Sequence, residues 1–287
     1  MNRSTEMMSF VSGGLMKVAN NLRQLVPVRY SSFIGKDLTK FYKTAHITQV
    51  VGQPGYYEIN LDTKKLKTPV GNVFQVPGES LALAVAAEWN TQEEKIKRHT
   101  MHITSLCNTA IDNPTHRTRS QVVRAICHYL GSDTLCYRMA EPEKLLAFQK
   151  ANWDPVLLWF KTRYGIELEP TEGIVSPEIS EATYLALEKQ LTSYTDWTLV
   201  GLQQLVECLK SLSLALALCE SEIEVQRAVY LSRLESAFQT EQWGSVEWYH
   251  DIEMQETQAR VAAATLFIHF CHDFSSMQTK HKHTLLS

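Results

Sequence analysis

The feature that most constrains this chain is its longest apolar stretch, residues 199–219, which follows a helical repeat. Leu202, Leu205 and Leu209 recur at the three- and four-residue spacing of one helix face. From residue 212 to residue 219 the stretch is apolar on nearly every side. A helix that lacks a polar face is usually buried all round. We therefore predict one continuous central helix, around which the rest of the C-terminal half packs.

A membrane-spanning helix is the alternative interpretation of this stretch. Glu207 and Lys210 interrupt it, which leaves fewer clean residues than the ~20 that a bilayer requires. The whole chain has 44% hydrophobic residues and charges of both signs, which is ordinary for a globular protein in water. We therefore expect no membrane span.

Charge is distributed unevenly along the chain. The first 30 residues carry four basic side chains and one acidic one, whereas the remainder holds 24 basic and 30 acidic residues. A mildly acidic body argues against nucleic acid as the main partner. The six cysteines include no C-x-x-C pair, so we expect reduced thiols in a non-oxidising compartment.

The first 30 residues have the composition of a mitochondrial transit peptide. They are basic and almost free of acid, and Leu15, Leu22 and Val26 fall on one face of a possible helix. Residues 29–32 resemble a matrix-processing site with cleavage near Tyr30. A disordered tail without an addressing role is the alternative, and a secretory signal is disfavoured because no unbroken apolar core is present.

The remaining chain divides into a β-rich part and a helical part. Residues 31–78 contain short alternating segments separated by turns, which predicts a small antiparallel β domain. Residues 79–274 read as successive helices, and residues 275–287 as a flexible tail. The expected fold class is α+β, with a small N-terminal antiparallel β domain followed by a larger all-α domain. Interruptions are predicted at residues 152–155 and in the irregular segment 165–180.

Motifs that would carry chemistry are weak in this sequence. It contains neither the phosphate-binding pattern G-x-x-x-x-G-K-[ST] nor G-x-G-x-x-G, so we expect no nucleotide or other cofactor. Cys136 lies near an arginine, with His128 upstream, and His269 and His272 are three residues apart on a predicted helix. These residues leave open a small matrix enzyme that uses Cys136 or a His269/His272 metal site.

Glu235 is the most unusual residue of the predicted helix at 225–242. It shares a helix face with Leu231 and Phe238. A carboxylate among apolar neighbours must be paired, hydrogen-bonded or kept for a partner. Glu235 is therefore either in an internal pair with Arg227 or Arg260, or a polar anchor on an exposed binding face.

Two aromatic clusters accompany this helix. Residues 243–251 form a predicted interhelical corner that contains Trp243 and Trp248, and a second cluster surrounds Trp153. Such corners usually belong to the core, but exposed tryptophans are also typical of binding hot spots.

The order and spacing of several segments resemble the mitochondrial F-type ATP synthase assembly factor 2 family. The matching segments are Tyr57–Asp62, Lys65–Pro69, Ala86–Trp89, Met101–Ala110, Asp133–Arg138, Trp153–Pro155, Ser232–Glu235 and Trp243–Trp248. Each segment alone is weak, but the series is specific because it runs in order with near-ungapped spacing.

The resemblance implies a matrix chaperone without enzymatic activity, and we expect it to be a monomer. Its partner would be the newly imported α subunit of the ATP synthase catalytic head, whose β-facing surface it would cover. Within the resemblance, Glu235 matches a position associated with activity, and Trp89 a position where the aromatic ring is required for the structure. We assign partner binding to Glu235, Trp243, Glu247 and Trp248, and structural roles to Trp89 and Trp153. A permanent structural subunit of a stable complex is a further alternative.

Overall fold

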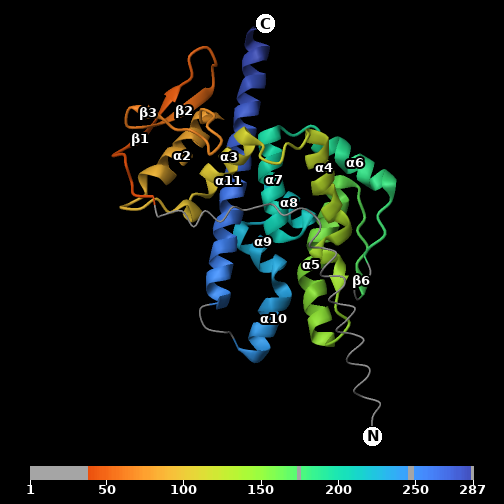
Figure 1. Cartoon of the computed structure of the whole chain (residues 1–287). Coiled ribbons are helices and arrows are strands. Elements are labelled where there is room, and N and C mark those ends of the chain that lie inside the picture. The colour runs from red at the N-terminus through yellow and green to blue at the C-terminus, as the bar shows by residue number, and fades with distance from the viewer. Residues whose placement is uncertain (1–37, 173–175, 245–248, 286–287) are drawn as a thin grey trace. The chain divides into compact units, whose positions relative to one another are not determined.

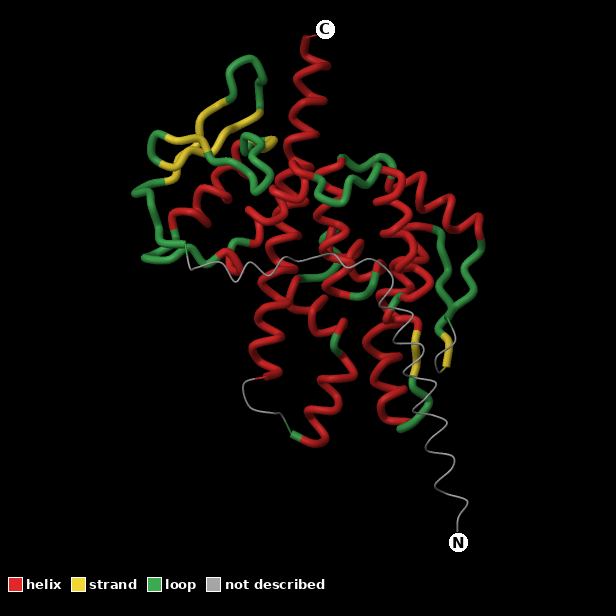
Figure 2. The backbone as a smooth tube through the Cα atoms, viewed as in Figure 1, coloured by secondary structure: helices red, strands yellow, loops and turns green. Residues whose placement is uncertain are grey.

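A four-stranded antiparallel sheet comes first in the part of the chain that the computed structural model describes, residues 38–172, 176–244 and 249–285 (Figure 1). Helices make up most of the remainder, which confirms the expected α+β class (Figure 2). The predicted transit peptide, residues 1–30, lies outside the described residues. Residues 38–39 and 94–96 form a separate small unit, joined by an antiparallel bridge between Thr39 and Lys95.

The sheet is organised around its second strand. Its strands are β1 (Ala45–Gln49), β2 (Tyr56–Leu61), β3 (Lys64–Lys65) and β4 (Gln75–Pro77). β2 pairs with β1 along one edge and with β3 and β4 along the other, and Ile47 lies opposite Ile59. Helix α2 (Glu79–Asn90) covers this small sheet, and the Asn90 side chain bonds both backbone groups of Ala45. Three or four short strands cannot bury much surface alone, so they depend on this helix.

The helices that follow are α3 (His102–Asp112), α4 (Arg119–His128), α5 (Glu143–Tyr164), α6 (Glu181–Leu191), α7 (Asp196–Leu209), α8 (Leu212–Cys219), α9 (Val225–Ser232), α10 (Leu234–Trp243) and α11 (Tyr249–Leu285). Helices α4, α6, α7 and α8 each begin at a Ser or Thr whose side-chain oxygen accepts a backbone N–H of the first turn. These caps satisfy donors that a helix start leaves free. Two short strands, β5 (Tyr137–Arg138) and β6 (Thr171–Glu172), pair in parallel.

The central apolar stretch forms two helices, so the prediction of one continuous helix is wrong. Lys210 adopts a left-handed conformation with φ 54°, and the buried Ser211 caps α8 by accepting from the backbone N–H of Leu214 at 3.1 Å. The Lys210 carbonyl accepts from the Thr134 hydroxyl at 2.8 Å, which holds the break in place. The prediction of burial is confirmed, because every residue from Leu212 to Leu218 is buried.

Two further predicted boundaries are wrong. Helix α5 continues through residues 152–155 and contains Pro155, because Trp153 is fully buried and its indole Nε1–H bonds the Leu231 carbonyl at 2.9 Å. That tertiary packing outweighs the lost backbone bond at the proline. The helix predicted at 225–242 is broken at Arg233, whose backbone leaves the helical region between α9 and α10.

The last helix connects the helical part to the sheet. α11 packs mainly against α7 and α3, and Phe274 meets Tyr56 edge to face, with ring centroids 5.5 Å apart. Gly201 permits the close approach of α7, because a Cβ there would lie 2.6 Å from Cγ1 of Ile268. α11 ends at Leu285, so it extends into the predicted flexible tail. No helix in the three described ranges is long and apolar enough to cross a bilayer. The division into two domains at residue 78 stays a prediction.

Candidate functional site

Glu235 lies in the first turn of α10, directly after the break at Arg233. Its Oε1 accepts a hydrogen bond from Nε2 of Gln149 at 2.7 Å. Gln149 is fully buried on α5, and its own Oε1 accepts from the backbone N–H of Met139 at 3.1 Å. The sequence therefore identified the unusual carboxylate but missed the residue that holds it. The available signal was a glutamine in the apolar stripe of α5, four residues before Trp153.

The partner of Glu235 is a neutral amide, so the expected internal pair with Arg227 or Arg260 is wrong. Arg227 donates to Asn152 at 3.0 Å, and Arg260 pairs with Glu256 on its own helix. Within the described residues Glu235 forms no ion pair. Its charge is consequently oriented by the fold without being neutralised by it.

Burial raises the pKa of the half-buried Glu235 carboxyl, and the hydrogen bond from Gln149 opposes this rise. Desolvation disfavours the charged form of a carboxyl group, so a cation or hydrogen-bond donor that approached from outside would be favourable here. The geometry suits a polar selector, because a neutral amide orients the carboxylate without forming an ion pair with it.

A buried cation–π pair, Arg138 over Trp153, links β5, α5 and the end of α9. Arg138 is buried, donates to Asp154 Oδ1 at 2.6 Å, and stacks its guanidinium 5.0 Å from the centre of the Trp153 ring. The fully buried Trp153 in turn bonds the carbonyl of Leu231, at the end of α9. Two donors of Arg138, Nε and one terminal nitrogen, have no partner among the described residues.

Large apolar side chains are exposed on segments linked to Glu235. The backbone of Met139 shares Gln149 with it, α9 precedes its helix α10, and α11 follows that helix. Met139, Tyr230, Ile252 and Met254 each expose between 39% and 59% of their surface. An ion pair of 2.8 Å between Arg233 and Glu253 joins the start of α10 to the beginning of α11, which carries Ile252 and Met254. We call Glu235 together with these four apolar residues the Glu235 surface.

The remaining predicted partner-binding residues stay predictions. Trp243 is the last residue of α10, and its side chain is outside the described part of the structure. Glu247 and Trp248 also lie outside the described residues. Trp89 is half-buried, not enclosed, with its ring 5.6 Å from that of Tyr42 and its carbonyl accepting the Tyr42 hydroxyl.

The residues considered for catalysis are poorly placed for it. Cys136 is fully buried, and burial raises the pKa of its thiol to about 12, so the thiolate nucleophile is scarce at neutral pH. His269 is half-buried and His272 is exposed. No group of three or more His, Cys, Asp or Glu residues in the described ranges could hold a metal ion.

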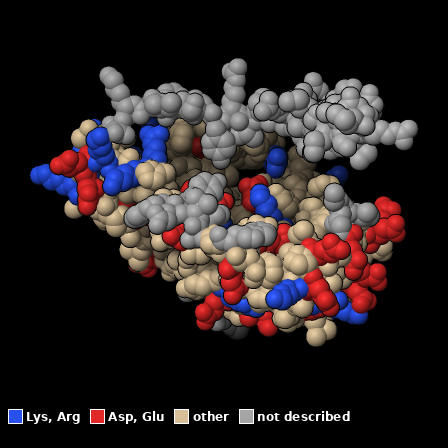
Figure 3. Space-filling view, turned by 90° about the horizontal axis from the view of Figure 1, so that it is seen from below, with Lys and Arg blue, Asp and Glu red and all other residues tan. Residues whose placement is uncertain are grey.

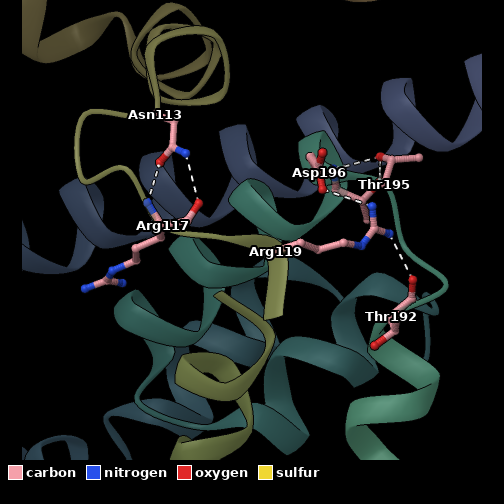
Figure 4. Close-up of polar contacts among 7 residues, drawn as sticks. Asn113, Arg117, Arg119, Thr192, Thr195 and Asp196 are labelled. Atoms are coloured by element: carbon pink, nitrogen blue, oxygen red, sulfur yellow. Dashed lines mark hydrogen bonds and ion pairs between the residues drawn. The ribbon is translucent and has the colours of Figure 1, made fainter. Parts of the chain in front are cut away.

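A second polar cluster, between α4 and α7, is satisfied internally (Figure 4). Arg119 bonds Asp196 at 3.0 Å and the Thr192 carbonyl at 2.9 Å, while the Asn113 side chain bonds both backbone groups of Arg117. These contacts bind the loop before α4 and the start of α7 into the fold. They offer little to a ligand, since the groups already have partners.

Comparison with known proteins gives a consistent result. A family model described as "ATP12 chaperone protein" matches residues 39–161. The curated "Protein atp12, mitochondrial" of Schizosaccharomyces pombe is 28% identical over 242 residues, covering 80% of this chain and 83% of that protein. "Protein ATP12, mitochondrial" of Saccharomyces cerevisiae is 24% identical over 276 residues, covering 81% and 84%.

Solved structures are similar over most of their length. The crystal structure of Atp12 from Paracoccus denitrificans superposes with a TM-score of 0.73 and 30% identity, covering 82% of this chain and 98% of that one. A protein from Agrobacterium tumefaciens gives a TM-score of 0.73 and 31% identity, covering 80% and 85%.

Proposed function

Because this chain belongs to the ATP12 chaperone family, we propose that it is an assembly chaperone of the mitochondrial F-type ATP synthase. In this proposal it binds the newly imported α subunit of the catalytic head in the matrix. It covers the surface of α that will later contact the β subunit, which keeps unassembled α from associating with itself. Residues 1–30 would act as the transit peptide.

The observation that carries this proposal is the Glu235 surface. It combines exposed apolar side chains with a carboxylate that the fold orients but does not neutralise. Contiguous apolar patches on soluble proteins mark interaction sites. Apolar contacts provide attraction to a sticky partner surface, and one fixed charge selects the partner that presents a matching donor or cation.

Such a chaperone must also release its client. Release by competition with the β subunit requires an affinity that is only moderate, and micromolar binding, about 8 kcal/mol, would suffice. Calorimetry with isolated α subunit measures this directly. Either undetectable binding or a picomolar complex would contradict the proposed cycle.

The central test separates the charge of Glu235 from its role in the fold. Purified α subunit is diluted from denaturant with wild-type protein, Glu235→Gln or Glu235→Lys, and light scattering records its aggregation. The wild type should suppress aggregation, and Glu235→Lys should not. Glu235→Gln keeps an oxygen acceptor for Gln149 and removes only the charge, so we expect a folded protein with weakened suppression.

The control is Glu241→Gln near the end of the same helix α10, which removes the same charge from an exposed side chain. This variant should suppress aggregation normally at a concentration where the protein remains folded. Equal suppression by wild type and both Glu235 variants would reject Glu235 as the selector. Failure of the wild type itself would reject the chaperone role.

A further inference from the structure

A cavity of about 340 Å³ lies between the loop after β3, the end of α2 and one side of α3. This volume is at the lower end of the range that is typical of ligand pockets, roughly 300–1,000 Å³. Its apolar floor includes Leu66, Phe74 and Met101, all of which are buried. We call this cavity the Trp89 pocket, since the indole of Trp89 forms part of its wall. It is separate from the Glu235 surface, none of whose residues line it.

Two buried polar atoms of the pocket residues have no partner in the described part of the chain. They are the indole Nε1–H of Trp89, a donor, and the amide Oδ1 of Asn108, an acceptor. More than nine in ten buried polar groups of proteins are hydrogen-bonded, so two such atoms on residues that line one cavity need an explanation. A single peptide group, with one C=O and one N–H, offers the complement of this donor and acceptor pair.

Two carboxylates, Glu88 and Asp112, accept hydrogen bonds from groups that form the walls of the pocket. Glu88 accepts from the backbone N–H groups of Ile103 and Thr104 at 2.8 and 2.7 Å, which ties α2 to the start of α3. Asp112, at the end of α3, accepts from the Thr68 hydroxyl at 2.6 Å and from the Asn72 amide at 2.9 Å. Both acids therefore have hydrogen-bond partners within the protein, and these bonds fix the positions of Thr68 and Thr104, which line the pocket.

The rim of the pocket is cationic. Lys67 and Arg98 line it and are exposed, and neither forms an ion pair with any described residue. No acidic side chain in the described ranges lines the cavity. Figure 3 shows one face of the molecule, on which Lys and Arg side chains are interspersed with Asp and Glu. The charge of the rim therefore favours an anionic occupant.

We propose that the Trp89 pocket receives an extended, acidic segment of the client polypeptide. One peptide group of the segment bonds the Trp89 indole N–H and the Asn108 oxygen, an apolar side chain enters the floor, and a carboxylate faces Lys67 and Arg98. That the segment belongs to a client rests on the proposed function, whereas the peptide chemistry rests on the pocket alone. This second site would let the chaperone hold a client at two separate places.

The test uses the full-length protein with nitrogen-15 tryptophan, observed by NMR. Six indole N–H resonances are expected, and Trp89→Phe identifies the one from Trp89. The probes are three end-capped tetrapeptides, Leu-Glu-Leu-Glu, Leu-Gln-Leu-Gln and Leu-Lys-Leu-Lys. The acidic peptide should shift the Trp89 resonance in a saturable way and bind roughly three- to tenfold more tightly than the glutamine peptide, with the difference reduced by salt.

Matched variants separate the two parts of the recognition. Lys67→Gln with Arg98→Gln should abolish the preference for the acidic peptide, whereas Lys43→Gln with Lys64→Gln removes the same charge outside the pocket and should leave it intact. Asn108→Ala should weaken all binding while the melting temperature is unchanged, because its buried oxygen has no partner to lose.

Two results would overturn the proposal. One is a Trp89 resonance that no peptide shifts but that exchanges with solvent, which would mean that water alone satisfies these atoms. The other is equal binding of the acidic and lysine peptides. If either result is found while the protein still suppresses α aggregation, the peptide-binding pocket is rejected and the proposed function stands. If the acidic peptide binds but α aggregation is not suppressed, the pocket is supported and the proposed function is rejected.

Discussion

At the scale of single residues, the candidate site depends on how a charge is held. Glu235 is oriented by the buried amide of Gln149, and its burial raises its pKa. A neutral partner orients a carboxylate without cancelling its charge, so the protein carries a small electrostatic cost at this position. Functional sites often retain such locally unfavourable features.

This cost predicts how stability depends on pH. The folded pKa of Glu235 is raised above its unfolded value, so its stabilising contribution is complete below the unfolded pKa and is lost as pH rises through the folded pKa. Glu235→Gln cannot ionise and should be as stable as the wild type in mild acid but more stable at neutral pH. Urea midpoints across this range measure the difference. A gap between the two proteins that narrows as pH rises would contradict the assignment.

Trp89 gives a second prediction at this scale. The ring is half-buried beside Tyr42 and on the wall of a cavity rimmed by Lys67 and Arg98. Trp89→Arg removes the ring contact and adds a third cation, so it should destabilise the fold by about 2–3 kcal/mol. Trp89→Phe keeps an aromatic ring and should cost less than half of that. Thermal melting tests this, and a Trp89→Arg protein that melts like the wild type would refute it.

At the scale of elements, the boundaries that differ from the prediction have two causes, one local and one tertiary. The apolar stretch at 199–219 has helical spacing throughout, yet Lys210 and Ser211 divide it. A serine followed by an apolar turn is an N-cap signal, and it was present within the stretch. The helix through Pro155 carries no such local signal, because its continuity comes from the buried Trp153.

The contact between α7 and α11 yields a test at this scale. A Cβ at Gly201 would overlap Cγ1 of Ile268 at 2.6 Å and approach the Phe267 ring at 3.0 Å. Overpacking of this kind costs about 1–3 kcal/mol, and the gain in helix propensity from alanine offsets up to about 1 kcal/mol. Gly201→Ala should therefore be destabilising by chemical denaturation. In an Ile268→Ala background the same substitution should become neutral or stabilising, and an equal loss in both backgrounds would contradict the overlap.

At the scale of the whole molecule, the two proposed interaction sites lie on separate elements. The Glu235 surface involves Met139 after β5, α9, α10 and the beginning of α11, whereas the Trp89 pocket lies between the loop after β3, α2 and α3. Two weak contacts on one body can together give useful retention without either being tight. This arrangement suits a chaperone that must bind and later release its client.

The corresponding prediction concerns assembly state. We expect the mature protein to sediment as a monomer and to form a one-to-one complex with α subunit that dissociates when β subunit is added. Analytical ultracentrifugation of the three mixtures measures this. A complex that persists after β is added, or that is found in the mature synthase, would instead indicate a permanent structural subunit.

The sequence alone determined the class of fold, the placement of a small sheet before the helices, the burial of residues 212–218 and the prominence of Glu235. These properties depend on periodicity and on helix caps, which involve residues only a few positions apart, so short segments of the sequence are enough to predict them. Only the tertiary structure decided what Glu235 contacts and which atoms meet in the Trp89 pocket. Gln149 and Glu235 are 86 residues apart, and Trp89 and Asn108 lie on different helices. Partners at such separations are chosen by how the helices pack, since no local pattern relates their positions along the chain.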